Sequence, residues 1–332
     1  MIKLILILFL NIIYCQWYTI NHGGIERSYF LSIPSTSSLE NPSPLIINLH
    51  GYGGNATQQL NYSQMNDYAL QQNIAVLYPQ GINNSWNVFT YWDTNDSDDV
   101  SYISELIDIV STNFHIDLDR IYACGMSNGG YMAYRLACDL SNKIAAFGSV
   151  TGNFMININD FNDCAQQNRE IPIIHFHGTY DNIVGYYPPS FDGSLTVTES
   201  IDYWIDYNDL TNESIQAINN FVYIYTYSKE SSNTNFTHYK IYGGGHEWFG
   251  NNWGFNTSEV LVDFFLNYNL SDFINSSFQG DLNNDGVINI LDIIILVNMI
   301  LINEYSDIAD INYDGIIDIL DLILYNNIIL GY

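Results

Sequence analysis

The stretch Arg120-Ile-Tyr-Ala-Cys-Gly-Met-Ser-Asn-Gly-Gly-Tyr-Met-Ala-Tyr-Arg-Leu-Ala137 decides the fold of this chain. An apolar run leads into Gly125-Met-Ser-Asn-Gly-Gly130, and a helical pattern of apolar residues follows. A serine at such a strand-turn-helix junction is typical of a nucleophile elbow. The turn strains the serine backbone, so glycines on either side are needed to let strand and helix approach closely. Ser127 is therefore the predicted nucleophile, and the structural alternative is an ordinary glycine-rich turn.

Short apolar runs alternate with helical patterns on both sides of this turn. The expected strands are 44–50, 74–78, 120–125, 144–150 and 171–177, and the expected helices are 99–110, 128–140 and 199–207. Continuous apolar strands separated by helices indicate a mostly parallel sheet covered on both faces. The fold class is therefore α/β.

A serine hydroxyl needs a base to take its proton, and the base needs a carboxylate to orient it. His246 is the predicted base because Gly243-Gly-Gly245 precedes it and Glu247-Trp248 follows, which gives a loop after the strand-like stretch 236–242. The other histidines end a strand, alternate along one, or, like His22 and His115, have no glycine or acid context that would place them at a site.

Asp181 is the predicted acid. It follows the apolar strand 171–177, at the edge of the sheet where parallel strands deliver functional loops. Asp202 and Asp206 lie on a predicted helix, where we expect them to be solvated. The resulting order of Ser127, Asp181 and His246 is the order that an α/β-hydrolase fold uses.

An oxyanion hole needs two backbone N–H groups directed at the developing negative charge. The residue after the nucleophile, Asn128, is predicted to supply one of them. Tyr52 in Leu49-His-Gly-Tyr-Gly-Gly54 is predicted to supply the other, because the flanking glycines let the backbone approach a substrate. An ordinary glycine turn is the alternative for this loop.

The chain resembles the extracellular poly(hydroxybutyrate) depolymerase and feruloyl esterase family over residues 28–266. The resemblance is carried, in this order, by Leu49-His-Gly51, Tyr78-Pro-Gln-Gly81, Asp119-Arg-Ile-Tyr122, Gly125-Met-Ser-Asn-Gly-Gly130, Leu136-Ala-Cys138, His177-Gly-Thr-Tyr-Asp181 and Gly243-Gly-Gly-His-Glu-Trp248. It implies an α/β-hydrolase that cleaves carboxylic esters through an acyl-enzyme, with no cofactor or metal in the chemistry. Tyr52 departs from the family, whose depolymerase-like members often have Cys there, and this position bears on the shape of the acyl pocket.

Two near copies of an acidic loop follow the esterase-like region. Each copy has oxygen-bearing side chains at loop positions one, three, five, nine and twelve and a glycine at position six, the spacing that Ca²⁺ requires, with a backbone carbonyl at position seven. The predicted ligands of the two Ca²⁺ ions are Asp281, Asn283, Asp285, Val287, Asn289 and Asp292 in the first loop and Asp310, Asn312, Asp314, Ile316, Asp318 and Asp321 in the second.

Each loop leads into a single apolar helix, so the pair resembles a dockerin, a small all-α module with paired calcium loops. The resemblance implies a cohesin-like scaffold as partner. At loop positions ten and eleven, however, the chain has Ile290-Leu291 and Ile319-Leu320, where cellulosomal dockerins often carry hydroxyls. Packing of the module against its own catalytic domain is the alternative. A membrane-spanning helix at 288–302 is excluded because Asp292 and Asn298 interrupt it.

Residues 1–15 read as a signal peptide, with one lysine before an apolar run too short to span a bilayer comfortably. The predicted organisation is therefore signal peptide 1–15, α/β-hydrolase domain 16–270, linker 271–279 and dockerin-like module 280–332. We expect a secreted, extracellular protein. In an oxidising compartment one disulfide is expected, and Cys138 with Cys164 is the predicted pair because both flank polar loop residues; the family resemblance supports the same pair.

The composition argues against nucleic acid as a partner. The formal net charge is −28, with 8 Lys and Arg residues in all and none after Lys240. A protein that binds nucleic acid needs clustered positive charge.

Three functions remain open at this level. The leading one is an esterase that removes feruloyl or acetyl groups from polysaccharide, with Trp86, Trp92 and Trp248 as candidates to line a cleft. The second is a polyester depolymerase, and the third is a non-catalytic, scaffold-attached binding protein.

Overall fold

The computed structural model describes residues 14–155, 169–190, 193–273, 280–283, 287–302, 304–306, 308–312 and 315–330. The chain divides into two compact units, Met1–Asn269 and Leu270–Tyr332. The predicted signal peptide lies largely outside the described residues, but Tyr14 and Cys15 already form the start of a strand. Of the predicted linker, residues 274–279 lie outside the described residues.

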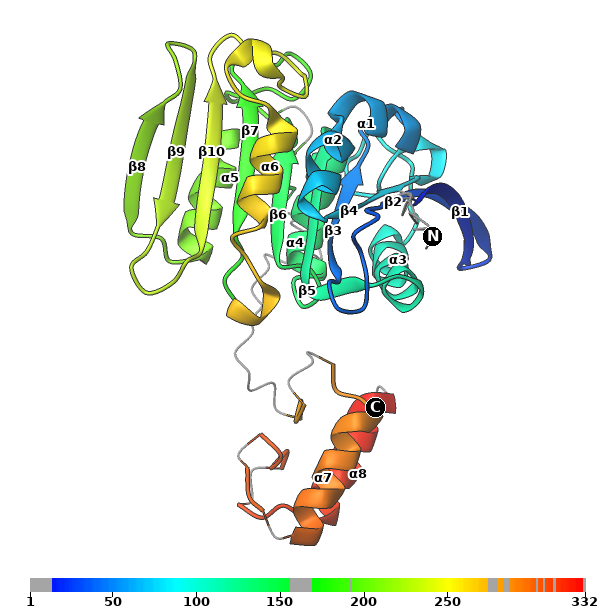
Figure 1. The fold of residues 1–332 in the computed structure, drawn as a ribbon. Helices are drawn as coiled ribbons and strands as arrows, with labels where there is room; N and C mark the ends of the chain where they lie inside the picture. Colours follow the sequence, from blue (N-terminus) through cyan, green and yellow to red (C-terminus); the bar gives the residue numbers. More distant parts are fainter. Residues whose placement is uncertain are drawn as a thin grey trace, which may run out of the picture. The chain divides into compact units, whose positions relative to one another are not determined.

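The first unit is built on one ten-stranded sheet in the order β1-β2-β4-β3-β5-β6-β7-β10-β9-β8 (Figure 1). The strands are β1 (Tyr14–His22), β2 (Ile25–Ile33), β3 (Ser43–Leu49), β4 (Ala75–Pro79), β5 (Ile116–Met126), β6 (Ala146–Val150), β7 (Ile173–Gly178), β8 (Asn212–Ala217), β9 (Val222–Ser228) and β10 (Asn235–Ile241). The interior strands β4, β3, β5, β6, β7 and β10 pair in parallel. Antiparallel strands complete both edges. The α/β-hydrolase prediction of a mostly parallel sheet is confirmed.

All five strands predicted from apolar runs are present in the parallel part of the sheet. The three predicted helices are present as well. The antiparallel edges were not predicted. Strand β8 reads Asn212-Glu-Ser-Ile-Gln-Ala217 and is exposed along its whole length, so it has no apolar signature to recognise. The hairpin of β1 and β2 turns at Gly23 and Gly24, both with positive φ.

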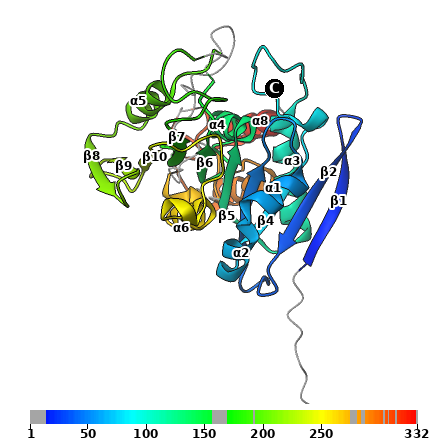
Figure 2. The same ribbon diagram turned by 90° about the horizontal axis from the view of Figure 1, so that it is seen from above.

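Helices cover both faces of the sheet. They are α1 (Ala56–Ser63), α2 (Met65–Ala69), α3 (Asp99–Asn113), α4 (Asn128–Asp139), α5 (Val197–Tyr207) and α6 (Thr257–Phe265), with short 3-10 turns at 70–72, 82–84, 251–253 and 270–272. The main apolar core joins α3, α4 and α5 to one face through Tyr102, Met132 and Trp204, among others. Helix α6 packs on the opposite face, beside α2 (Figure 2).

This arrangement brings four loops to one edge of the sheet. Strands β3, β5, β7 and β10 run parallel, and register pairs Leu49 with Gly125 and Gly178 with Ile241. The loops that follow therefore start at the same level, at the carboxyl ends of the strands, where α/β folds place their sites.

The described residues of the second unit include the α-helices α7 (Ile290–Ile302) and α8 (Ile319–Leu330). Its core is small and includes Leu296, Met299, Ala309 and Tyr325. In the part of the chain that the structure describes, no helix is long and apolar enough to span a bilayer.

Candidate active site

Ser127 lies on a strained turn between β5 and α4. Its φ of 54° and ψ of −122° fall in a region that non-glycine residues rarely adopt. The neighbouring glycines make the turn possible. A Cβ on Gly125 would lie 2.4 Å from the Gly129 carbonyl oxygen, and a Cβ on Gly129 would lie 2.3 Å from that of Leu49. The serine is thus held at the top of the sheet in the geometry of a nucleophile elbow.

Asp181 and His246 lie side by side on the loops after β7 and β10. His246 Nδ1 lies 2.7 Å from Asp181 Oδ2, while Asp181 Oδ1 accepts the backbone N–H groups of Ile183 and Val184 at 2.9 Å each. Burial alone would raise the pKa of Asp181, but hydrogen bonds from His177 and His246 outweigh it and hold the pKa well below its usual range. Asp181 is therefore an ionised partner for the imidazole.

The third contact of a catalytic triad is open in this structure. Within the described residues, Ser127 Oγ forms no hydrogen bond with His246. Such contacts are often long without substrate and tighten when it binds. The structure thus brings the predicted acid and base together and places the predicted nucleophile on another loop at the same edge of the sheet.

The glycine loop after β3 touches the nucleophile. A Cβ on Gly51 would lie 3.4 Å from Ser127 Cβ. In the part of the chain that the structure describes, the Tyr52 N–H has no protein acceptor, whereas the next N–H groups donate to Asn84 and Gly51. Asn128 opens helix α4, where N–H groups lack intrahelical acceptors. Both remain the predicted oxyanion donors.

Trp86 connects the elbow to the glycine loop from below. Its backbone N–H and carbonyl bond the Asn128 amide at 2.7 and 3.0 Å, and its indole N–H donates to the His50 carbonyl at 2.8 Å. The side chain is 0% exposed. The expectation that Trp86 lines a cleft is therefore wrong. Its ring is buried and holds the elbow and the glycine loop together. Sequence alone gave no sign of this role.

The other two tryptophans differ in exposure. Trp248 is buried, and its indole N–H donates to Ser258 at 3.0 Å, so it too supports the loop rather than lining an open cleft. Trp92 is half-buried and packs edge-on against Tyr52, with ring centroids 5.0 Å apart. Of the three predicted tryptophans, Trp92 alone adjoins the oxyanion loop with an accessible surface.

A pocket of about 520 Å³ opens beside the elbow. It is lined by His50, Gly51, Tyr52, Gly54, Gln58, Gln59, Asn61, Tyr62 and Met126. Tyr62 and Tyr52 are exposed aromatic rings at this site. Helix α1, which supplies Gln58, Asn61 and Tyr62, was not among the predicted elements, and no motif marks these residues in the sequence.

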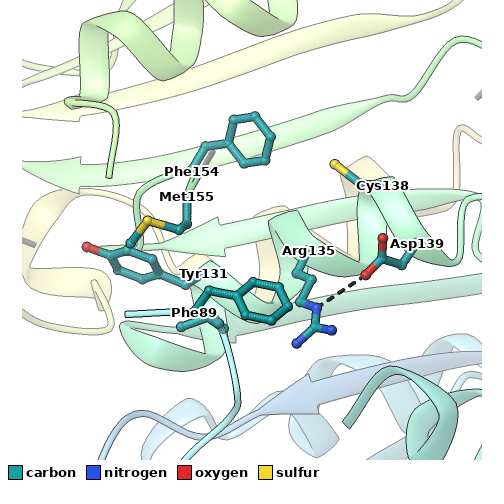
Figure 3. A pocket seen from close by; sticks show the side chains of 8 residues that line it. Phe89, Tyr131, Arg135, Cys138, Asp139, Phe154 and Met155 are labelled. Atoms are coloured by element: carbon teal, nitrogen blue, oxygen red, sulfur yellow. Dashed lines mark hydrogen bonds and ion pairs between the residues drawn. The ribbon is translucent and has the colours of Figure 1, made fainter. Parts of the chain in front are cut away.

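A second cavity, behind the elbow helix, is too small for a ligand. It encloses about 20 Å³ between Phe89, Tyr131, Phe154 and Met155, room for about one water (Figure 3). Arg135 also lines it, with its guanidinium 3.2 Å from Asp139 and 4.1 Å from the centre of the Phe89 ring.

His22 contacts an acid and a serine that lie far from it in the sequence. His22 Nδ1 lies 2.5 Å from Glu105, and its Nε2 lies 3.0 Å from Ser101 Oγ. Both partners lie on α3, which presents no strained turn and no glycine loop there. This contact therefore lacks the donors that stabilise an oxyanion, which separates it from the Ser127 site.

Cys138, at the end of α4, is disulfide-bonded, whereas Cys15 and Cys124 are free. The predicted partner, Cys164, lies outside the described residues. Cys124 is buried in β5, as a packed small hydrophobe.

The two acidic loops of the second unit have matching hydrogen bonds. Asp292 accepts the N–H groups of Leu282 and Asn289, and Asp321 accepts those of Ile311 and Asp318, at 2.8 to 3.0 Å. The predicted ligands Asn283, Asn289, Asn312 and Asp318 are half-buried, while Val287 and Ile316 are exposed. Asp285 and Asp314 lie outside the described residues.

The donor chemistry of these loops fits a hard cation. Asp281, Asp292, Asp310 and Asp321 are all less than 5% exposed, and no Lys or Arg follows Lys240 to neutralise them. Buried carboxylates need a positive partner. Among the described residues alone, no three acidic, histidine or cysteine side chains converge on one point.

Comparison with known proteins agrees with both units. Residues 27–169 match the family model Esterase PHB depolymerase, and residues 279–330 match Dockerin type I domain, a calcium-binding class of module. A bifunctional acetylxylan esterase/xylanase of Neocallimastix patriciarum is 31% identical over 167 residues, 49% of this chain and 22% of that protein. Feruloyl esterase B of Piromyces equi is 32% identical over 164 residues, 48% of this chain and 30% of that protein. The chain thus spans less than a third of the length of these relatives.

Solved structures show the same fold. The acetyl xylan esterase of Aspergillus awamori superposes with a TM-score of 0.54 at 13% identity, covering 75% of this chain and 98% of that one. A feruloyl esterase module of Clostridium thermocellum gives 0.53 at 13% identity, covering 79% and 90%. Residues 27–169 are therefore similar to the esterase PHB depolymerase family, and residues 279–330 are similar to the dockerin type I domain.

Proposed function

We propose that the protein is a serine hydrolase of carboxylic esters. The observation that carries this proposal is the strained Ser127 beside the Gly51 loop, with Asp181 and His246 hydrogen-bonded to each other on loops at the same edge of the sheet. In the proposed reaction, Ser127 Oγ attacks the ester carbonyl carbon while His246 Nε2 takes its proton. The Tyr52 and Asn128 N–H groups stabilise the oxyanion.

His246 then protonates the leaving alcohol, and an acyl-enzyme remains on Ser127. Water, deprotonated by His246, attacks the acyl carbonyl and releases the carboxylic acid. Asp181 holds the imidazole in the required tautomer throughout.

For the substrate we propose a feruloyl or acetyl ester on polysaccharide. The similarity to feruloyl and acetylxylan esterases supports it, and a pocket of about 520 Å³, lined by Met126 and the Gly51 loop, is larger than an acetyl group needs. A polyester depolymerase is the alternative, supported by the name of the matching family model.

Initial rates of hydrolysis of methyl ferulate, acetylated xylan and hydroxybutyrate oligomers, measured side by side, test this proposal. We expect the highest kcat/KM on a feruloyl or acetylated polysaccharide ester. Preference for the hydroxybutyrate oligomers would favour the depolymerase, and no hydrolysis of any of the three would reject the substrate class.

For the second unit we propose two bound Ca²⁺ ions and attachment to a cohesin-like scaffold of an extracellular complex. The dockerin match and the paired buried carboxylates support the ions. Exposed apolar side chains at equivalent places on the two helices, Ile290 with Leu291 and Ile319 with Leu320, would meet the partner. Binding of an immobilised cohesin in calcium, lost in chelator, would support attachment; failure of every cohesin tested would favour packing in cis.

A further inference from the structure

A continuous line of buried polar side chains reaches Asp181 from the core of the first unit. Tyr134 Oη lies 2.6 Å from His175 Nδ1, and His175 Nε2 lies 3.0 Å from His177 Nδ1. His177 Nε2 lies 2.8 Å from the Val184 carbonyl oxygen and 3.4 Å from Asp181 Oδ2. The tyrosine and both histidines are at most 1% exposed.

With both imidazoles neutral, the hydrogen bonds of this line run in one direction. Because the Val184 carbonyl can only accept, His177 Nε2 carries a proton. Neutral His177 therefore accepts at Nδ1 from His175 Nε2–H, and His175 accepts at Nδ1 from the Tyr134 hydroxyl. Burial, and then the neighbouring His177 and His238, lower the pKa of His175 well below its usual value, so His175 stays neutral. Every donor thus points toward Asp181.

The line completes the set of donors around the catalytic acid. Asp181 Oδ1 accepts the two backbone N–H groups of its own loop, and Oδ2 lies 2.7 Å from His246 Nδ1 and 3.4 Å from His177 Nε2, whose N–H also faces the Val184 carbonyl at 2.8 Å. These contacts oppose rotation of the carboxylate away from the imidazole that it orients.

We propose that His177 is a positioning residue that holds Asp181 for the reaction, and that Tyr134 and His175 fix the tautomer in which His177 donates. This inference rests on the proposed function. Tyr134 lies on α4 and His175 and His177 on β7, so the elbow helix and the acid loop are joined beneath the site.

A neighbouring pair provides a matched control. Tyr186 Oη lies 2.9 Å from His238 Nε2, and His238 Nδ1 lies 3.2 Å from the His175 carbonyl oxygen. This pair is buried in the same core, but it bonds the backbone of His175 and not its ring. Its own carbonyl acceptor fixes the His238 tautomer without help from Tyr186.

The test compares Tyr134→Phe, Tyr186→Phe, His177→Gln and His177→Phe in the full chain with calcium, using a soluble ester that the wild type hydrolyses. For His177→Phe we expect kcat to fall by about 10-fold to 100-fold, the range for one hydrogen bond to a charged group, with KM unchanged. His177→Gln should recover part of this loss, since its amide N–H can replace Nε2–H. Tyr134→Phe should lower kcat in the same way, and Tyr186→Phe should not.

The pH dependence of kcat/KM provides a second test, because it would not change if His177 and Tyr134 only stabilised the fold. Without the His177 donor, Asp181 is more basic and holds the protonated form of its imidazole partner more strongly. The acidic limb of the kcat/KM profile should therefore move to higher pH in His177→Phe and Tyr134→Phe. Equal kcat values and equal pH profiles for Tyr134→Phe and Tyr186→Phe would overturn the proposal.

Two further arms keep the result decisive. If His177→Phe does not fold, the comparison of Tyr134→Phe with Tyr186→Phe decides alone. If the wild type hydrolyses no ester, the proposed function fails, and the low-field proton NMR signal of His246 Nδ1–H tests the line by itself. That signal should shift in Tyr134→Phe and stay in place in Tyr186→Phe. The reverse result would reject the proposed line from Tyr134 to Asp181.

Discussion

Ser127 has a backbone conformation that the surrounding residues must impose. The strain of φ 54° persists because α4 begins directly after it and because the Gly129 backbone fits against Leu49. Asn128 adds two hydrogen bonds to Trp86 beneath the turn. The proposed nucleophile is thus presented by a rigid support, which is what catalysis by positioning requires.

Asp181→Asn should leave the fold intact and lower kcat by about 10⁴-fold, the loss seen when a triad carboxylate becomes an amide. An amide has one oxygen and one NH2 group, so it cannot accept at both positions where Asp181 does, and His246 is left in the wrong tautomer. Stopped-time assays on a soluble ester measure this. Asp202→Asn, an exposed acid on α5, is the matched control and should retain wild-type kcat. A loss of less than about tenfold in Asp181→Asn would point to another acid.

Single residues could be predicted only where their chemistry is tied to a local pattern. Ser127 lies in a strand-turn-helix context, and Asp181 and His246 each follow a strand, so the sequence marks all three. Trp86 has no such pattern: an aromatic residue in a polar loop looks the same in sequence whether it lines a cleft or fills the core. His177 was recognised only as a strand residue, because its contact with Asp181 depends on how the loop folds back.

At the level of elements, the acid and the base meet because two loops pack backbone against backbone. A Cβ on Gly178 would lie 2.2 Å from the Gly244 carbonyl oxygen, so only glycine allows the β7 and β10 loops to approach this closely. The contact is reinforced by the Tyr180 N–H, which donates to the Gly244 carbonyl at 2.9 Å.

Gly178→Ala should therefore push the two loops apart, destabilise the domain by about 1–3 kcal/mol and lower kcat more than KM rises. Urea unfolding and steady-state kinetics measure the two effects. Gly185→Ala is the matched control, because a Cβ there would meet only Tyr187 O, at 3.6 Å. If both variants behaved alike, close packing of the loops would not be what positions Asp181 and His246.

Interior elements were predictable and edge elements were not. Strands β3, β4, β6 and β7 and the second half of β5 are buried on both faces, so each appears as a largely apolar run. Strands β8 and β9 are exposed or half-buried and owe their existence to pairing with β10, which no local pattern in Asn212-Glu-Ser-Ile-Gln-Ala217 reveals. The pocket residues on α1 were missed for a similar reason, since that helix is short and weakly amphipathic in its sequence.

Across the whole first unit, buried neutral histidines couple stability to pH. Burial lowers the pKa of His50 to about 4 and that of His238 to about 3. Unfolding exposes these groups to water, where they regain their usual value of 6.5. Their contribution is fully present above pH 6.5 and is lost as the pH falls toward the folded values, because the unfolded chain binds protons that the native chain does not.

We therefore expect the free energy of unfolding to fall between pH 6.5 and pH 4, by up to about 1.4 kcal/mol per pH unit for each such histidine. Urea unfolding at several pH values measures the slope. His238→Gln should reduce it, and His115→Gln, at an exposed position, serves as the control. An unchanged slope in His238→Gln would mean that other groups, such as the paired carboxylates, carry the pH dependence.

The two units should respond differently to calcium. Binding free energy at a site that forms only on folding becomes folding free energy, so chelation should unfold residues after Gly280. None of the acidic loop residues belongs to the Ser127 site, so a chain shortened to residues 1–278 should keep its turnover on a small soluble ester, with or without chelator. Circular dichroism and initial rates measure both effects; loss of turnover on removing the tail would make it an integral part of the catalytic fold.

The division of the chain into an α/β domain and a repeated acidic module could be predicted because each has its own pattern in the sequence. The first has alternating apolar runs, and the second has two copies of a loop. The ester substrate could not be predicted, because its choice depends on the shape of a pocket assembled from β3, α1 and the elbow. The shared chemistry of these substrates, attack by Ser127 on a carbonyl carbon, can be tested independently of that choice.

Mass spectrometry of the acylated enzyme tests this central claim most directly. The wild type is mixed with an activated acetyl or feruloyl ester, quenched in acid and digested. We predict the acyl group on the peptide that contains Ser127, with no acylation and no hydrolysis in Ser127→Ala. Acylation of a different residue, or sustained turnover in Ser127→Ala, would contradict the account.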